Sequence, residues 1–363
     1  PGWVTGMTSD VKWELKDADR AIRNKVDSRY TMTQDRIYRL EKEVQALKWK
    51  ANETQVNPNA VGGNSPLTEP STEESIVGAG AGEERDFAIA PGVVIRMCWI
   101  PAGHFNMGSP DHEQGRRDDM EGPCHRVEIK EGFWMAKTEL TQQQWLAGAG
   151  IDTSARSDES RKGVADIWMN EDGLPPVEMN VKFRGKNFPV QRIEWVEAKA
   201  WCVELTRRYQ AHGALPSGWE FTLPTEAQWE YACRAGTTNA LNNGKDLNQS
   251  DYEKECKHLD EIAWYHNNSG KQAHPVGLKK PNAWGLHDMH GNVGEWCDDL
   301  YRPYPYGQNI PETNPEYAEF RSYRGGAWTW WAKGCRSASR YRYATDYFDH
   351  DLGFRPALRP VAR

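Results

Sequence analysis

Closely spaced turn residues are the feature that most constrains how this chain can fold. From Asp86 onwards Gly and Pro interrupt the sequence so often that apolar runs stay short, and the 363-residue chain holds 32 Gly, 21 Pro and 17 Trp. Long helices and broad regular sheets need longer uninterrupted segments. We therefore expect a single domain over 86–363 that is built from brief, mixed elements packed around many aromatic side chains.

The overall composition narrows the classes of function. The net charge is −7, and Lys and Arg do not gather into a basic stripe, which argues against nucleic acid as a partner. No run of about 18 apolar residues occurs, so we expect no membrane span. Because the sequence begins at Pro1, we expect that the native start, and any signal peptide, lies upstream.

The cysteines argue against a structural metal. None forms a CxxC pair or a Cys/His zinc spacing, and their number is odd, so buried thiols are expected rather than a disulfide scaffold. The seven cysteines are Cys98, Cys124, Cys202, Cys233, Cys256, Cys297 and Cys335.

Residues 10–50 carry a heptad pattern of apolar and semi-apolar residues with one four-residue stutter. Its members are Val11, Leu15, Ala18, Ile22, Val26, Tyr30, Thr33, Ile37, Leu40, Val44 and Leu47. This narrow seam predicts a coiled-coil oligomerisation helix that joins copies of the chain, with a trimer favoured over a dimer. An amphipathic helix packed on its own domain is the alternative. Residues 51–85, rich in small and polar residues, are expected to form a linker.

Helix signals are clearest at three places in the domain. Thr141 with Gln144 and Thr225 with Gln228 form capping boxes that predict helices over 141–149 and 225–235. In the second of these, Trp229, Ala232 and Cys233 fall on one face. A third helix is expected over 195–209, and the run 93–108 alternates like a hairpin around residues 101–103. The residues expected to face the core from the third helix are Val196, Ala200, Val203 and Leu205.

The block 324–356 is crowded with Trp, Tyr, Phe, Asp, His and Arg. Its aromatic residues follow neither a period of 2 nor one of 3.6, so they are hard to place on one buried face. Large aromatic rings interleaved with charged and small residues are typical of binding patches. The block is therefore predicted to be a recognition surface, and an aromatic-rich segment of the core is the alternative.

Seven motifs in order resemble the formylglycine-generating enzyme, or sulfatase-modifying factor, family. They are PAGHFNMGS (101–109), FPVQRIEWVEAKAWC (188–202), FTLPTEAQWEYACRAGT (221–237), PNAWGLHDMHGNVGEW (281–296), RGGAW (324–328), CRSASR (335–340) and LGFRPA (352–357). The resemblance implies a variant of the C-type lectin fold, an irregular α+β domain in which short helices lie beside twisted antiparallel sheets.

The enzymes of this family use copper, which two cysteines bind shortly after the GG-aromatic motif. Here Trp330 stands at the place expected for the first cysteine, and Cys335 is the possible second. One thiolate cannot hold copper in a linear two-sulfur geometry, so no copper is expected. A copper-dependent formylglycine-generating type of oxidase remains the alternative function, and it would need another thiol near Cys335, for which Cys297 is the candidate.

The C-terminal block also resembles the variable region of diversity-generating retroelement variable proteins. Those systems mutate template adenines, chiefly in Asn codons ending in C or T, which can become Tyr, Phe, Ser, Thr, Ala, Asp, His, Arg or Gly. Every residue over 341–351 belongs to this reachable set, whereas Trp330, Trp331 and Lys333 do not. The resemblance implies a variable binding region near 327–351, with these predicted ligand-binding residues: Thr329, Trp330, Trp331, Gly334, Ser339, Tyr341, Tyr343, Ala344, Tyr347, Phe348, Asp349 and His350.

The GLHDMHGNVGEW motif has a possible metal role, because family members often hold calcium at this turn. Asn292, the Val293 carbonyl and Glu295 are hard oxygen donors, and Asp288 could assist. A turn without a metal is the alternative. His287 and His290 lack a third ligand and are expected to be ordinary polar residues. Of the arginines in the C-terminal block, Arg336 and Arg355 are expected to be paired inside the domain.

Together these observations predict a non-catalytic ligand-binding or receptor-binding protein. Its partner would be a protein or carbohydrate receptor on a cell surface, and the chain would act outside the cell, on a virion or on a cell surface. A phage tail-fibre tip or a displayed adhesin would suit this design, since a coiled coil that joins several copies raises apparent affinity. An undiversified structural member of the family is the remaining alternative.

Overall fold

The computed structural model describes residues 76–149, 185–251, 255–304 and 320–361. All of them belong to one unit of the chain, residues 65–363. The predicted coiled coil over 10–50 and most of the predicted linker lie outside the described residues. The packed domain begins about ten residues before the expected boundary, because Ile76 is buried and its carbonyl accepts a hydrogen bond from the Trp134 indole at 2.6 Å.

A five-stranded antiparallel sheet forms one half of the domain. Its strands are β1 (Glu84–Ala90), β2 (Val93–Ile100), β5 (Phe133–Ala136), β11 (Ala357–Pro360) and β6 (Trp219–Thr222), in the order β1-β2-β5-β11-β6. The predicted hairpin over 93–108 is wrong. β3 (Gly103–Met107) leaves β2 and pairs with β4 (His125–Ile129) in a separate two-stranded ribbon, while β2 pairs with β1 and β5.

Both faces of the five-stranded sheet are buried. Along β2, Met97 and Trp99 belong to one hydrophobic cluster, whereas Cys98 and Ile100 belong to another. Successive side chains of a strand point to opposite faces, so a strand buried on both sides reads as a continuous apolar run. This explains why the segment MCWI carries no polar residue.

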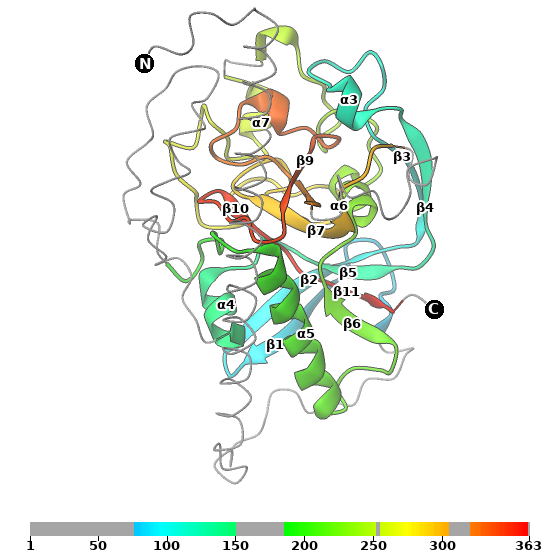
Figure 1. Cartoon of the computed structure of the whole chain (residues 1–363), viewed down its shortest axis with the longest axis vertical. Coiled ribbons are helices and arrows are strands. Elements are labelled where there is room, and N and C mark those ends of the chain that lie inside the picture. The colour runs from blue at the N-terminus through cyan, green and yellow to red at the C-terminus, as the bar shows by residue number, and fades with distance from the viewer. Residues whose placement is uncertain (1–75, 150–184, 252–254, 305–319, 362–363) are drawn as a thin grey trace, which may run out of the picture. The chain divides into compact units, whose positions relative to one another are not determined.

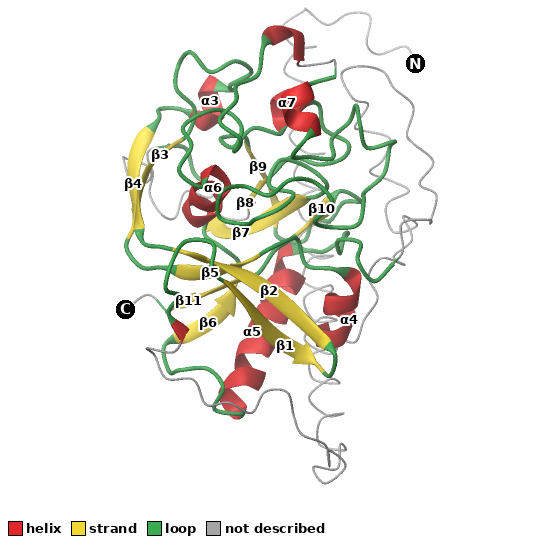
Figure 2. Cartoon of the chain, turned by 180° about the vertical axis from the view of Figure 1, so that it is seen from behind, coloured by secondary structure: helices red, strands yellow, loops and turns green. Residues whose placement is uncertain are grey.

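Two helices cover one face of this sheet. α4 (Gln142–Ala149) contacts β1 and β2, and α5 (Trp195–Ala211) contacts β6 and α4. Figure 1 shows α5 crossing in front of the sheet, and Figure 2 shows the same sheet in front of α5 from behind. Both predicted capping boxes are confirmed. Thr141 Oγ1 accepts from the Gln144 N–H at 3.3 Å, and Thr225 Oγ1 accepts from the Gln228 N–H at 3.0 Å at the start of α6 (Glu226–Arg234).

The prediction of the buried face of α5 was partly wrong. Leu205 is buried as expected, but Val203 is 57% exposed, Val196 is 39% exposed, and Ala200 is exposed as well. The helix instead buries its aromatic residues, which remove more apolar area from water than a valine does. The buried set is Ala198, Trp201, Cys202, Leu205 and Tyr209.

A four-stranded sheet forms the other half of the domain and carries the C-terminal block. Its strands are β10 (Leu352–Gly353), β7 (Gly294–Leu300), β8 (Phe320–Arg324) and β9 (Arg340–Ala344), in the order β10-β7-β8-β9. β10 pairs with β7 in parallel, and the other pairs are antiparallel. α6 contacts β7 and β8. The short elements are α3 (Asp118–Glu121), α7 (Lys257–Asp260), η3 (Gln249–Asp251) and η4 (Ala332–Gly334).

The cysteines agree with the expectation of buried thiols in six of seven cases. All seven lie within the described residues, all are free, and only Cys124 is exposed. Among the helices of the described part of the chain, none combines the length and apolar character that crossing a membrane requires.

Candidate binding face

Buried ion pairs hold the four-stranded sheet against α6. Arg324 on β8 donates to Glu226 and Glu230 of α6 at 2.8 Å each, and Arg340 on β9 donates to Glu226 at 2.6 and 2.7 Å. All four side chains have no exposed area. Buried charges are stable only when they are paired and fully hydrogen-bonded, so these contacts fix the position of β8 and β9 on the helix.

Two further arginines connect distant loops to the C-terminal block. Arg336, 1% exposed, donates to Glu113 at 2.5 Å and to both oxygens of Glu121 at 2.6 and 2.7 Å. Arg355 makes a bidentate pair with Glu295 of β7 at 2.6 Å for both contacts. The prediction that Arg336 and Arg355 are paired inside the domain is therefore confirmed.

The side chains of strand β9 alternate between two faces of the sheet. Tyr341 and Tyr343 stack on Tyr323 of β8, with ring centroids 5.4 and 5.0 Å apart. Arg340 and Arg342 lie on the other side of the strand, where both guanidinium groups are over the ring of Tyr301. Since neighbouring residues of a strand point to opposite faces, one side of β9 serves the framework and the other presents tyrosines.

The tyrosines of β9 belong to a continuous aromatic cluster. Trp330 lies 4.2 Å from Tyr341, and Tyr347 stacks on Tyr343 at 3.6 Å, as distances between ring centroids. Each of these four rings is intermediate between buried and exposed, and each also packs against the main hydrophobic core. The cluster is therefore half-buried, with rings whose positions are set by their neighbours before any ligand arrives.

An acidic turn follows the aromatic cluster. Asp349 accepts hydrogen bonds from the Tyr347 hydroxyl at 2.6 Å and from His350 Nδ1 at 2.5 Å. Asp351 accepts from the Thr329 hydroxyl and from the Trp330 indole, the latter at 3.2 Å. Burial raises the pKa of Asp349, but the hydrogen bonds from His350 and Tyr347 together with the charge of His350 outweigh burial and bring the pKa to about 2. Burial lowers the pKa of His350, and its pairing with Asp349 raises the pKa above the usual value.

Most of the predicted ligand-binding residues are partly exposed and lie together. The partly exposed residues are these ten: Thr329, Trp330, Trp331, Tyr341, Tyr343, Ala344, Tyr347, Phe348, Asp349 and His350. Ring contacts and the hydrogen bonds of Asp349 and Asp351 connect all of them except Trp331, Ala344 and Phe348, which adjoin connected residues in the chain. We call this set, with Asp351, the aromatic face. Gly334 and Ser339 were expected on it but are buried. The Ser339 hydroxyl donates inwards to the Lys333 carbonyl at 3.3 Å, so this residue belongs to the framework.

Two neighbours of the aromatic face were not predicted from the sequence. His266 stacks on Trp331 with ring centroids 3.8 Å apart. Arg117, beside α3, lies 5.8 Å from the ring of Tyr341. Both come from segments far from the C-terminal block, and no local pattern predicts such long-range contacts.

The thiols considered for a copper site are free and buried. Cys335 is fully buried, and burial raises the pKa of its thiol to about 12. Cys297, the candidate for a second thiol, packs in a different hydrophobic cluster from Cys335. Cys256 shares the cluster of Cys335, and burial raises its pKa as well. Trp330 fills the place expected for the first cysteine and packs against this cluster.

The donors predicted for calcium have other partners. Both oxygens of Glu295 are held by Arg355, and one also accepts from the Trp229 indole at 2.7 Å. The side-chain oxygen of Asn292 accepts from the His274 N–H at 2.8 Å. Asp288 fits a cation better, because its Oδ1 and Glu139 Oε2 are buried without a hydrogen-bond partner among the described residues. Calcium at this turn stays a prediction.

The histidines of the same motif are structural, as expected. His290 is fully buried, its Nε2 accepts from the Asn242 N–H at 3.0 Å, and its Nδ1 donates to the Cys335 carbonyl at 2.6 Å. Burial lowers the pKa of His290 to about 4, so this ring is neutral at pH 7. The ring therefore connects the motif to the loop that carries Cys335.

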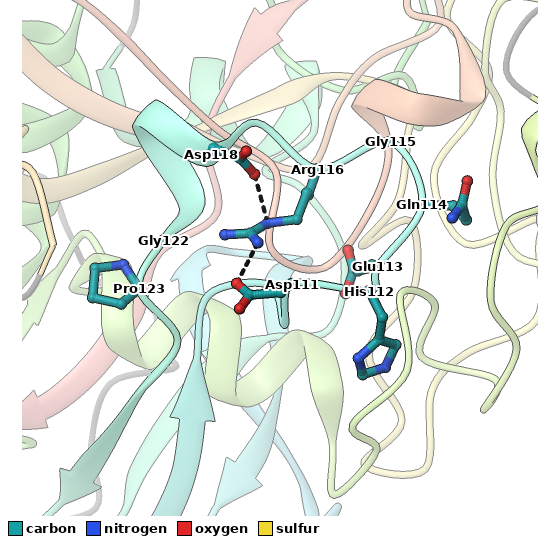
Figure 3. A pocket seen from close by; sticks show the side chains of 9 residues that line it. All are labelled: Asp111, His112, Glu113, Gln114, Gly115, Arg116, Asp118, Gly122 and Pro123. Atoms are coloured by element: carbon teal, nitrogen blue, oxygen red, sulfur yellow. Dashed lines mark hydrogen bonds and ion pairs between the residues drawn. The ribbon is translucent and has the colours of Figure 1, made fainter.

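An open groove of about 790 Å³ lies over the loop 111–123. Figure 3 shows Arg116 between Asp111 and Asp118 at this groove, with ion-pair distances of 2.5 and 3.1 Å. Asp111 is 99% and Asp118 85% exposed in their side chains, whereas Arg116 is 13% exposed. The groove is therefore polar and rich in accessible carboxylate oxygens.

These observations define an irregular α+β domain whose buried Arg–Glu pairs support a sheet with an aromatic edge. The sequence profile of the Sulfatase-modifying factor enzyme 1-like domain matches residues 86–360. The chain belongs to this family.

Among similar proteins, the mouse formylglycine-generating enzyme is 27% identical over 308 residues, which cover 74% of this chain and 76% of the mouse protein. Treponema denticola variable protein 1 is 26% identical, with a TM-score of 0.55, and the match covers 76% of this chain and 99% of that structure. PvdO from Pseudomonas aeruginosa, at 24% identity, a TM-score of 0.58 and coverage of 78% and 100%, shares the fold. The similar proteins thus include both an enzyme and a variable protein.

Proposed function

We propose that this protein is a non-catalytic binding protein of the diversity-generating retroelement type, in which the aromatic face contacts the ligand. The observation that carries this proposal is the separation of roles at β9. Buried Arg324 and Arg340 hold the strand to α6, whereas the neighbouring Tyr341 and Tyr343 are partly exposed. Residues on the aromatic face can therefore change while the buried ion pairs stay intact.

The likeness to Treponema denticola variable protein 1 supports this assignment. The reachable codon set over 341–351 supports it independently, because a sequence of unrelated origin would contain Trp, Lys, Glu, Gln or Met in some of these positions. Rigid aromatic rings that are held in place before binding give much contact area at little entropic cost.

The ligand would be a protein or carbohydrate receptor on a cell surface, and the protein would act on a virion or on the surface of a cell. The heptad pattern over 10–50 supports assembly into a homo-oligomer, with a trimer favoured. Several linked copies would bind a repeated receptor far more tightly than one copy, without new contacts. The mass of the full chain in solution, measured by light scattering, tests this assembly.

Population sequencing of the 3′ end of the gene tests the proposal directly. Substitutions should be confined to codons between 327 and 351 and should follow the reachable set. The codons of Glu226, Arg324 and Arg340, which form the buried pairs, should not vary. Variation spread evenly over the domain, or none over 341–351, would contradict the proposal and favour an undiversified structural member of the family.

A copper-dependent oxidase is the alternative function, since the mouse formylglycine-generating enzyme is 27% identical. In this chain Cys256 is the thiol that shares a hydrophobic cluster with Cys335, and burial disfavours the thiolate form of both. Anaerobic titration with Cu(I), followed by oxygen consumption on a cysteine-containing peptide, separates the two functions. The oxidase function would replace the binding proposal if the wild type binds stoichiometric copper and turns over the peptide, and if Cys335→Ser loses the copper.

A further inference from the structure

The groove over residues 111–123 is joined rigidly to the aromatic face. Arg336 holds Glu113, Glu121 and the Gly115 carbonyl, the last at 2.8 Å. Arg340, at the start of β9, donates to the Met120 carbonyl at 3.2 Å. The loop that forms the groove and the strand that presents the tyrosines are therefore held to each other by buried guanidinium groups.

Arg117 closes the gap between the two surfaces. Its guanidinium carbon lies 5.8 Å from the ring centre of Tyr341, and the residue itself is exposed. α3, which follows Arg117, contacts β9. Because exposed side chains connect the groove to the tyrosines, one partner can contact both.

The chemistry of the groove favours a cationic group. Asp111 and Asp118 offer nearly fully exposed carboxylates, and the group that now bridges them is the guanidinium of Arg116. Both carboxylates are nearly fully exposed, so water screens their pairs with Arg116 and an incoming cation can compete with Arg116 for them. A guanidinium is planar and donates in two directions, which suits two carboxylates that face each other across the groove.

The groove also has room for this exchange. Its volume of about 790 Å³ exceeds that of a single side chain. Gly122 lines it, and a Cβ on this residue would come within 2.6 Å of Arg116 Nη2. The absence of a side chain at Gly122 lets the guanidinium of Arg116 lie against the backbone at the wall of the groove.

We propose that this groove is a second part of the ligand-binding surface and takes an arginine or lysine side chain of a partner protein. The inference rests on the proposed function, because the rest of that partner would contact the aromatic face. The groove lies outside the residues predicted to diversify, so it would supply a constant contact beside a variable one. It would favour partners with a basic patch through charge complementarity.

The test uses the full chain and fluorescein-labelled tetra-arginine and tetra-glutamate peptides, with binding measured by fluorescence anisotropy at low salt. The double variant Asp111→Asn/Asp118→Asn should weaken tetra-arginine binding by about fivefold or more, since it removes both charged acceptors. Arg116→Gln should strengthen tetra-arginine binding by about threefold, because it removes the competing internal cation.

Matched variants control for the change in net charge. Glu128→Gln/Glu131→Gln removes two exposed carboxylates on and after β4, and Arg126→Gln removes one exposed guanidinium on the same strand. Neither should change tetra-arginine binding by more than about 1.5-fold, because these charges lie outside the groove and solvent ions screen them from a peptide bound there. Thermal unfolding of every variant shows whether the fold is retained.

Several outcomes would overturn the inference. Equal weakening in the control variants would mean nonspecific attraction to an acidic protein. Binding of tetra-glutamate that is lost in Arg116→Gln would assign the groove to an anionic partner. If population sequencing shows diversification over 341–351 but tetra-arginine does not bind, the groove inference fails while the proposed function stands.

Discussion

Glu226 is the residue whose replacement most directly tests how the aromatic face is supported. Its carboxylate has no exposed area and accepts hydrogen bonds from Arg324, Arg340 and the Ser322 hydroxyl at distances of 2.6 to 2.8 Å. Glu226→Gln keeps the shape but removes the charge that balances two buried guanidinium groups. Breaking a buried ion pair from one side costs about 3–5 kcal/mol, and we expect a loss of this size.

Thermal unfolding followed by circular dichroism measures the loss. For a domain of this length, about 1 kcal/mol corresponds to about 2–4 °C, so Tm should fall by about 6–20 °C. Glu261→Gln is the control, because it removes a carboxylate from an exposed pair with Lys280 and should leave Tm close to that of the wild type. A loss in Glu226→Gln as small as that of the control would refute the idea that buried ion pairs hold β8 and β9 on α6.

Three further predictions concern pH and packing. Burial raises the folded-state pKa of Asp288 to about 6 and that of Glu139 well above its usual range. The contribution of these two carboxyl groups to the free energy of unfolding should therefore be fully present below the unfolded carboxyl pKa of about 4. It should be lost as the pH rises through 6. Glu139→Gln should flatten this slope and raise Tm at pH 7 in EDTA; a calcium-dependent rise of Tm in the wild type that the variant lacks would instead place calcium there. Asp349→Asn should lower the pKa of His350, as followed by proton NMR, because an amide oxygen can still accept the hydrogen bond but the carboxylate charge that stabilises the protonated ring is lost. Val203→Ser should leave the unfolding free energy within about 0.5 kcal/mol of wild type, since this residue is 57% exposed, and a larger loss would restore the original prediction of a core-facing valine.

Local signals predicted the helices better than the strand pairing. A capping box specifies a helix start with residues three positions apart, so Thr141 and Thr225 were sufficient to place α4 and α6. Strand pairing depends on distant residues. The turn at 101–103 looks like a hairpin turn, yet β3 finds its partner in β4, which lies beyond the loop over the groove. No property of residues 93–108 distinguishes the two pairings.

Aromatic residues also misled the prediction of α5. The apolar period of the helix was assigned from valines, but burial followed the larger rings of Trp201 and Tyr209. The capping box at the start of α5 was not predicted from the sequence. Glu194 precedes α5 as its N-cap, and its N–H is bonded by the Glu197 carboxylate at 3.1 Å, so the residue takes part in a capping box.

The candidate site could be located from the sequence, but its support could not. Composition and codon set marked the block over 341–351, because both are properties of consecutive residues. The carboxylates that pair with Arg336 and Arg324 lie 223 and 98 positions away. A sequence shows that a buried arginine needs a partner, and only the fold shows which carboxylate supplies it.

The structure implies that tolerance to change differs along the block over 341–351, which we propose to be diversified. Tyr341 and Tyr343 stack on Tyr323, so replacing either ring removes packing against a buried residue as well as changing the surface. Asp346 is exposed, and the structure gives its side chain no ring contact. A surface that must vary without unfolding would concentrate its changes where side chains add little to stability. Diversification should therefore be freest at the exposed position 346, whereas small residues at 341 and 343 should appear chiefly in less stable variants.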